Sequence, residues 1–160
     1  MKILVVSDSH GRTYNFCKVL DKVGPIDLLF HLGDLEGSED DIEILAECPT
    51  HMVCGNNDFF SSLDRDKVVE LGKYRIFMSH GHRYGVGYTL DRIIDAAKEE
   101  GCNVIMYGHT HIPLIQYEQG MYIINPGSIT LPRQEGRKPS YILMELDRFG
   151  ELHFTLNFLD

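Results

Sequence analysis

Cysteine is scarce in this sequence, and its few occurrences are scattered. The four cysteines, Cys17, Cys48, Cys54 and Cys102, form no C-x-x-C pair and no dense disulfide framework. Free cysteines of this kind usually behave as small buried hydrophobic side chains. We therefore expect all four to be reduced and buried, in a protein of the cytoplasm.

Long hydrophobic runs are absent as well. No apolar stretch approaches the ~20 residues that a membrane-spanning helix needs. The strand-like segment 2–6 follows Met1 directly, without a charged leader region or a small-residue cleavage site. We therefore expect neither a secretory signal nor a membrane association.

Positive charge is in short supply. The chain has 15 Lys and Arg against 24 Asp and Glu, which gives a formal net charge of −9. This balance argues against broad attraction to nucleic-acid backbones or anionic membranes, so long DNA or RNA is a disfavoured substrate. Metal ions bound among the carboxylates would still invert the local field, whatever the summed charge.

The remaining composition is that of a globular protein. Of the 160 residues, 43% are hydrophobic and 24% charged, with six prolines against fifteen glycines. These values exclude disordered, collagenous and coiled-coil classes. A chain of this length buries roughly 70% of its unfolded surface in one core. We find no repeats or linkers and expect a single domain over residues 1–160.

The apolar pattern predicts an α/β protein. Strand and helix signals alternate in the first half as a βαβαβ unit, at 3–6, 14–23, 28–32, 42–45 and 51–54. A strand at 74–79, a helix at 88–99 and a strand at 104–107 follow. Two hairpins are then predicted, from 112–117 with 121–124 and from 141–146 with 152–158. This order favours two packed sheets with helices outside.

Five short polar clusters follow the predicted strands. They are Asp8-Ser9-His10, Gly33-Asp34, Gly55-Asn56-Asn57-Asp58, His80-Gly81-His82 and Gly108-His109-Thr110-His111. In open α/β sheets ligands bind beyond the carboxyl ends of strands, so we expect the clusters to meet at one edge. An i, i+2 spacing in extended backbone would point both side chains of a pair to the same side.

The clusters supply seven candidate metal ligands and no thiolate. Any one cluster alone is explained by a capping Asp or a hydrogen-bonded His. Together, imidazole, carboxylate and amide donors suit borderline to hard divalent ions. Seven donors are too many for one ion, whereas two ions that share a carboxylate would use them all.

The ordered set D-x-H, G-D, G-N-x-D, H-G-H and G-H-T-H resembles the calcineurin-like metallophosphoesterase superfamily over residues 1 to about 133. The short length, His31 to Asp34, and Asn125 to Ser128 followed by Pro132-Arg133 are similar to its small bacterial and archaeal phosphodiesterase branch, related to the retromer subunit Vps29. The resemblance implies a four-layer α/β/β/α sandwich of two mixed sheets with helices outside.

The resemblance also implies a ligand set for two divalent ions. Metal one would be held by Asp8, His10, Asp34 and His111. Metal two would be held by Asp34, Asn56, His80 and His109, with Asp34 as the bridge. Manganese is the first choice of ion, with Ni, Zn, Fe and Mg as alternatives, since N and O ligands suit all of them.

The implied activity is that of a dinuclear-metal-dependent phosphodiesterase. It would hydrolyse a small or nucleotide-like phosphodiester by attack of a hydroxide that bridges the ions. A nucleotide phosphatase or nuclease is an alternative, and so is a non-catalytic, Vps29-like scaffold that binds partner proteins. A scaffold needs no complete ligand set, so the seven competent residues favour catalysis. Small members of the branch are often homo-oligomers.

Three further residues, Asn57, His82 and Arg133, are candidates for catalytic or substrate-binding roles. Asn57 stands where the superfamily often has a His, and an amide cannot act as a general acid. We therefore expect good turnover only of esters with stable leaving groups. We also expect an Asn57→His variant to have higher activity on alkyl phosphate esters. His82 either binds phosphate, donates a proton or orients a neighbouring His. Arg133 either grips a phosphate oxygen or is a solvated loop charge, and His31 packs behind the site.

Overall fold

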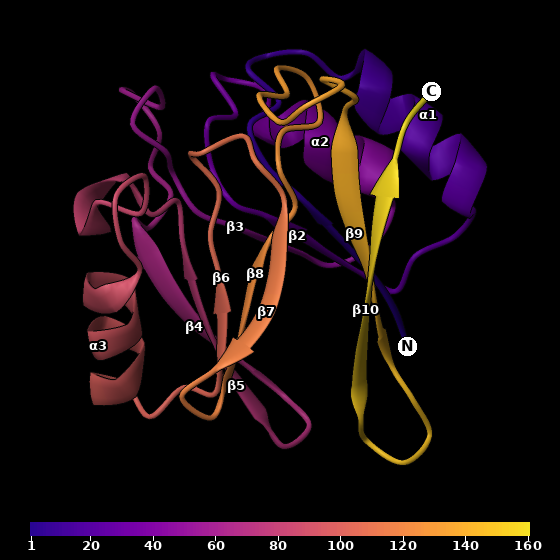
Figure 1. Ribbon diagram of the computed structural model, residues 1–160. Helices are drawn as coiled ribbons and strands as arrows, with labels where there is room; N and C mark the ends of the chain where they lie inside the picture. The colour runs from indigo at the N-terminus through magenta and orange to yellow at the C-terminus, as the bar shows by residue number, and fades with distance from the viewer.

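Two five-stranded sheets face each other in the computed structural model, which describes residues 1–160 (Figure 1). The first sheet has the order β10-β9-β1-β2-β3, built from β1 (Lys2–Val6), β2 (Leu28–His31), β3 (Thr50–Met52), β9 (Ser140–Leu146) and β10 (Leu152–Phe158). Strands β1, β2 and β3 are parallel, and β9 runs antiparallel to both β1 and β10. The C-terminal hairpin therefore completes the N-terminal sheet.

The second sheet is also mixed. Its order is β4-β5-β6-β8-β7, built from β4 (Asp66–Leu71), β5 (Tyr74–Ser79), β6 (Val104–Met106), β7 (Leu114–Glu118) and β8 (Met121–Asn125). Strands β5, β6 and β8 are parallel, and the edge strands β4 and β7 are antiparallel to their neighbours. No helix of the chain has the length and apolar character required to cross a membrane.

Helices cover the outer face of each sheet. Helices α1 (Tyr14–Val23) and α2 (Glu39–Ala46) pack on the first sheet through one apolar cluster, and α3 (Asp91–Glu99) packs on the second through another. A short 3-10 turn, η1 (His82–Tyr84), follows β5. The α/β/β/α order of layers confirms the predicted sandwich (Figure 1).

Alternation along the strands assigns each side chain to a layer. In β1, Ile3 and Val5 belong to the cluster between the sheets, whereas Leu4 and Val6 belong to the cluster under α1 and α2. All four are fully buried. Burial of each such side chain contributes about 1.5–3 kcal/mol to stability. The central strands therefore stabilise the packing of the layers and keep the residues at their ends in defined positions.

Three expectations from the sequence need correction. Strand β4 was not predicted, because its apolar residues are few and only Val69 and Leu71 are buried. Helix α3 begins at Asp91, three residues later than expected, after a turn in which Thr89 Oγ1 binds the Asp91 carboxylate at 2.7 Å. Cys17 and Cys48 are only half-buried, although all four cysteines are free.

Candidate metal centre

Both sheets deliver residues to one edge of the sandwich. Asp8 and His10 follow β1, Asp34 follows β2, and Asn56 follows β3, all in the first sheet. From the second sheet, His80 follows β5, and both His109 and His111 follow β6. The predicted convergence of the polar clusters therefore occurs, and it joins four residues of one sheet to three of the other.

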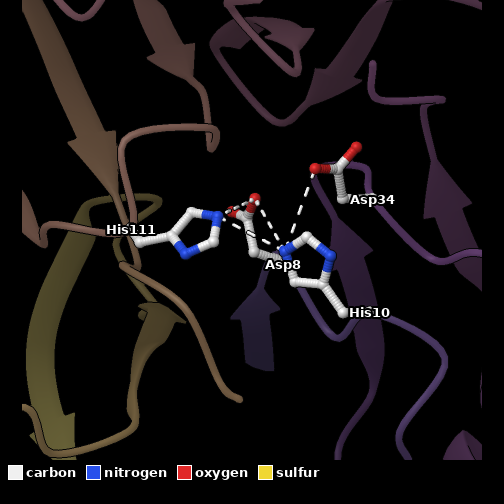
Figure 2. A group of neighbouring side chains, drawn as sticks. All are labelled: Asp8, His10, Asp34 and His111. Carbon is white, nitrogen blue, oxygen red and sulfur yellow. Dashed lines mark hydrogen bonds and ion pairs between the residues drawn. The ribbon is translucent and has the colours of Figure 1, made fainter. Parts of the chain in front are cut away.

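Four of these residues form a compact group (Figure 2). One ligand atom from each of Asp8, His10, Asp34 and His111 lies within 4.8 Å of the others. Asp8, Asp34 and His111 are buried, and His10 is half-buried. His111 Nε2 lies 3.1 Å from Asp8 Oδ1, and His10 Nε2 lies 3.9 Å from Asp34 Oδ2. This is a candidate site for one metal ion.

A second group adjoins the first through Asp34. His80 Nε2 lies 3.5 Å from Asp34 Oδ2 and 3.1 Å from Asn56 Oδ1. The ring of His109 packs edge-on against that of His80, with 5.2 Å between centroids. Asp34 is thus in reach of histidines from both groups, because His10 and His80 approach the same Oδ2 atom.

The histidines of both groups are fixed by hydrogen bonds on their outer nitrogens. His10 Nδ1 lies 2.7 Å from the Glu36 carboxylate. His80 Nδ1 lies 2.7 Å from the Leu32 carbonyl oxygen, and His111 Nδ1 lies 2.6 Å from the Leu131 carbonyl oxygen. Since these oxygens can only accept, each neutral ring carries its proton on Nδ1. The Nε2 lone pairs therefore all point inward.

Inside the centre, acceptors face acceptors. His10 Nε2 lies 3.3 Å from His111 Nε2, and His80 Nε2 faces the Asn56 carbonyl oxygen. Asp8 Oδ1 is buried and accepts no hydrogen bond. Buried acceptors without donors are costly, so the arrangement calls for a cation or for added protons. This donor chemistry fits divalent metal ions, with histidines oriented by their outer partners as metal ligands usually are.

The charges of the group reinforce one another. Burial alone would raise the pKa of Asp8, but contacts with His111 and the charge of His80 hold it below its ordinary value. Asp34 is likewise opposed by burial, yet His80 and the Asn57 donors lower its pKa strongly. For His80, burial is outweighed by the two carboxylates, which raise its pKa. Both carboxylates are therefore ionised at neutral pH.

The backbone of the centre is not extended, which corrects the expectation drawn from the i, i+2 spacing. Five of the proposed ligands have left-handed backbone with φ between 49° and 68°: Asp8, His10, Asp34, His109 and His111. This conformation costs an L residue about 1–2 kcal/mol. Consecutive tight turns, rather than strand pleating, aim the paired side chains at one point.

Two glycines allow the carboxylates to sit where they do. A Cβ on Gly55 would lie 2.1 Å from Asp34 Oδ1, and one on Gly108 would lie 2.9 Å from Asp8 Oδ2. Both distances are shorter than real Cβ contacts. Glycine is required at these positions because the backbone approaches the ligand side chains so closely.

Asn57 and Asp58 hold Asp34 from behind. Asn57 donates its backbone N–H to Asp34 Oδ1 at 2.9 Å and its side-chain amide to Oδ2 at 2.7 Å. The Asp58 carboxylate accepts the backbone N–H groups of Asp34, Glu36 and Gly55 at 2.6 to 2.8 Å. The Asp58 carboxylate therefore ties the loop that carries Asp34 to the loop that carries Asn56.

The other predicted site residues differ in position. The His82 ring lies near those of His80 and His109, with centroids 5.5 and 6.0 Å away, and its Nδ1 is buried without a partner. Arg133 is exposed, and its backbone N–H donates to the His111 carbonyl. His31 is fully buried behind the site, as expected, and shares a hydrogen bond with Ser9 Oγ at 3.0 Å.

Sequence reasoning missed the residues that orient the histidines. Glu36 was not singled out, although its carboxylate meets His10 Nδ1. Leu32 and Leu131 contribute only main-chain carbonyls, for which side-chain type carries no signal. For Glu36, its place two residues beyond Asp34 was the one available hint.

Comparison with known proteins identifies the family. Residues 1–148 match the family model described as the calcineurin-like phosphoesterase superfamily domain. The chain belongs to this superfamily. It is 35% identical over 148 residues to the "Probable metallophosphoesterase YsnB" of Bacillus subtilis, covering 92% of this chain and 85% of that protein. It is also 33% identical to "Phosphodiesterase YfcE" of Escherichia coli, over 49% of this chain and 39% of that protein.

Solved structures of the superfamily share the fold. A predicted phosphoesterase from Streptococcus pneumoniae superposes with a TM-score of 0.79 at 32% identity, covering 99% of this chain and 97% of that one. Vps29 of Entamoeba histolytica, solved in complex with Zn²⁺, superposes with a TM-score of 0.78 at 22% identity, covering 99% of both chains. The family and its named relatives make this chain a metal-dependent phosphoesterase, a hydrolase.

Proposed function

We propose that this chain, as a single domain, is a phosphodiesterase that uses two divalent ions. One observation carries the proposal: the Nε2 atoms of three histidines converge on two ionised carboxylates, and Asp8 Oδ1 among them is buried and accepts no hydrogen bond. Asp8, His10, Asp34 and His111 would hold one ion. Asp34, Asn56, His80 and His109 would hold the other. Manganese is our first choice, and Ni, Zn, Fe and Mg suit the same donors.

When bound, the two ions would draw in phosphoryl oxygens and lower the pKa of a coordinated water toward ~7. The chain itself keeps the ligands in place. Asn57 holds both oxygens of Asp34, so its amide serves the proposed bridging carboxylate and not a leaving group. This supports the expectation that esters with stable leaving groups, such as aryl and nucleotide-like diesters, are the better substrates.

His82 and Arg133 are proposed to contact the substrate. The partnerless Nδ1 of His82 is available to contact a phosphoryl oxygen or to donate a proton to the leaving group. Burial, together with the charges of His80 and His109, lowers the pKa of His82, so the ring is neutral at pH 7. Arg133 adjoins the His111 loop, and its exposed guanidinium is free to pair with a non-bridging oxygen.

The proposal is tested with metal-stripped protein. Bis(p-nitrophenyl) phosphate and p-nitrophenyl phosphate are offered with Mn, Ni, Zn or Mg added back singly, and bound metal is counted by mass spectrometry. We expect two ions per chain and faster cleavage of the diester. Asp34→Asn should lower the rate at least about 10³-fold, since a metal centre supplies several kcal/mol of charge stabilisation.

Asp95→Asn is the matched control, because Asp95 is an exposed carboxylate on α3. It should retain full activity and metal content. One bound ion per chain with full activity would contradict the dinuclear proposal. Two bound ions without activity on either ester would favour the alternative, a scaffold for partner proteins like the structurally similar Vps29.

A further inference from the structure

A polar pocket of about 410 Å³ lies beside the proposed metal centre. We call it the Arg65 pocket; its walls include Asn56, Phe59, Arg65, His82 and Arg83. Its lining residues come from the β3–β4 connection and from the segment after β5, the same segments that carry Asn56 and His80. Its volume falls within the range of about 300–1,000 Å³ common for small-molecule sites.

One wall of the pocket belongs to the centre itself. Asn56 lines the pocket and faces His80 Nε2 at 3.1 Å, and His82 contributes the buried, partnerless Nδ1. A phosphodiester held at the centre would therefore direct one of its two ester arms into this pocket. An arm held there would contact the side chains that line the pocket.

The pocket offers one uncommitted positive charge. Arg83 pairs with Asp66 at 3.3 Å, and that carboxylate also accepts from the Tyr84 hydroxyl. Asp58, the acid in the wall, is satisfied by three backbone N–H groups. Arg65 forms no ion pair and no side-chain hydrogen bond with the chain. The exposed Arg65 guanidinium is therefore suited to pair with an anion beside the centre.

An aromatic ring borders the same space. The Phe59 side chain lines the pocket and yet is 81% exposed, with no aromatic partner in the fold. Planar rings stack on such a face largely independently of their hydrogen-bonding pattern. The pocket thus combines a stacking surface with a cation, next to the place where the phosphate is held.

We propose that the Arg65 pocket binds the ester arm of a nucleotide-like phosphodiester that carries a second phosphate, with the base on Phe59 and the second phosphate on Arg65. This rests on the proposed function and names its substrate class. A diester with a bare aryl arm would use only part of the pocket. A nucleoside arm that ends in a phosphate would use all of it.

Two substrates that differ only in the second phosphate test the inference. They are thymidine 5′-(p-nitrophenyl phosphate) with and without a 3′-phosphate, and both release p-nitrophenol. In the unmodified, metal-loaded protein the 3′-phosphate should lower KM about tenfold. Arg65→Gln should remove that gain without changing kcat on the simpler substrate. Phe59→Leu should raise KM for both thymidine esters but not for methyl p-nitrophenyl phosphate.

Arg148→Gln supplies the matched control, because it removes the same charge at the far β9–β10 turn. It should leave the tenfold gain intact. An equal gain in wild type and Arg65→Gln would overturn the inference. So would the absence of any gain in wild type.

A binding measurement separates this inference from the proposed function. Titration of metal-stripped protein with thymidine 3′,5′-bisphosphate should give a dissociation constant about tenfold weaker for Arg65→Gln than for wild type or Arg148→Gln. If no diester is cleaved but this difference holds, the pocket stands and the proposed activity fails. If all three proteins bind alike, or none binds, the pocket assignment is wrong.

Discussion

Two histidine–aspartate pairs lie at opposite ends of the strands of the first sheet, and they behave differently. At the β9–β10 turn, exposed His153 meets Asp147 at 2.9 Å, and this hydrogen bond, together with the backbone N–H groups of Glu151 and Phe149, lowers the pKa of Asp147 to about 2. At the metal centre, His111 meets Asp8 at 3.1 Å, but its proton is committed to the Leu131 carbonyl. The first pair is complete in itself, and the second calls for a cation or an added proton.

The comparison shows that distance alone does not identify a metal ligand. What distinguishes the centre is which ring nitrogen of each histidine carries the proton. The hydrogen-bond partner of Nδ1 determines this position. Burial then makes the missing donor costly, whereas water satisfies the exposed pair at the turn. The following changes alter one side of this comparison at a time.

Gly55→Ala should have the largest effect. The new Cβ would lie 2.1 Å from Asp34 Oδ1 and 2.5 Å from the Asp34 nitrogen, so Asp34 must move. A displacement of about 1 Å at a catalytic group can cost about 10²-fold, and we expect at least that loss of diester cleavage. Gly87→Ala is the control, because nothing lies within 4 Å of a Cβ there. Equal activity of the two variants would show that the close approach of the Gly55 backbone to Asp34 does not matter for activity.

His31 should govern part of the response to acid. Burial lowers its pKa to about 4, against an ordinary value of 6.5, so the unfolded chain takes up this proton first. Its contribution to stability is therefore complete above pH 6.5 and is lost as the pH falls to about 4. The loss amounts to about 3 kcal/mol.

Urea unfolding of metal-stripped protein from pH 7 to 4 measures this contribution. His31→Gln should flatten the pH dependence of the unfolding free energy relative to wild type. His153→Gln should not, because His153 is exposed at the turn. The same slope in wild type and His31→Gln would show that His31 is not the group being titrated.

Asp147→Asn should have the smallest effect. The pair lies at the surface, with His153 exposed and Asp147 half-buried, and surface pairs contribute little to stability. Diester hydrolysis and metal content should match wild type, and the Tm should shift only slightly. A changed metal requirement would mean that the two ends of the sheet are coupled, contrary to the comparison.

The sequence predicted the sandwich and the convergence of the site because both follow from strand ends. Asp8 and His80 follow apolar runs, so they lie near the carboxyl ends of strands whatever the conformation of the turn. The turns themselves could not be predicted, because the sign of φ at His10 or His109 leaves no trace in the alternation of side chains. Strand β4 was missed because its edge position needs few apolar residues.

The ligand set draws on both sheets, and this bears on the stability of the whole chain. Asp8 and Asp34 come from one sheet, and His80 and His111 come from the other. Ions bound by these residues would therefore link the two sheets across their interface. Binding to the folded chain alone stabilises it by mass action, by about 4 kcal/mol when the free ion exceeds its dissociation constant a thousandfold. Metal supply would then control the resistance of the sandwich to opening as well as its chemistry.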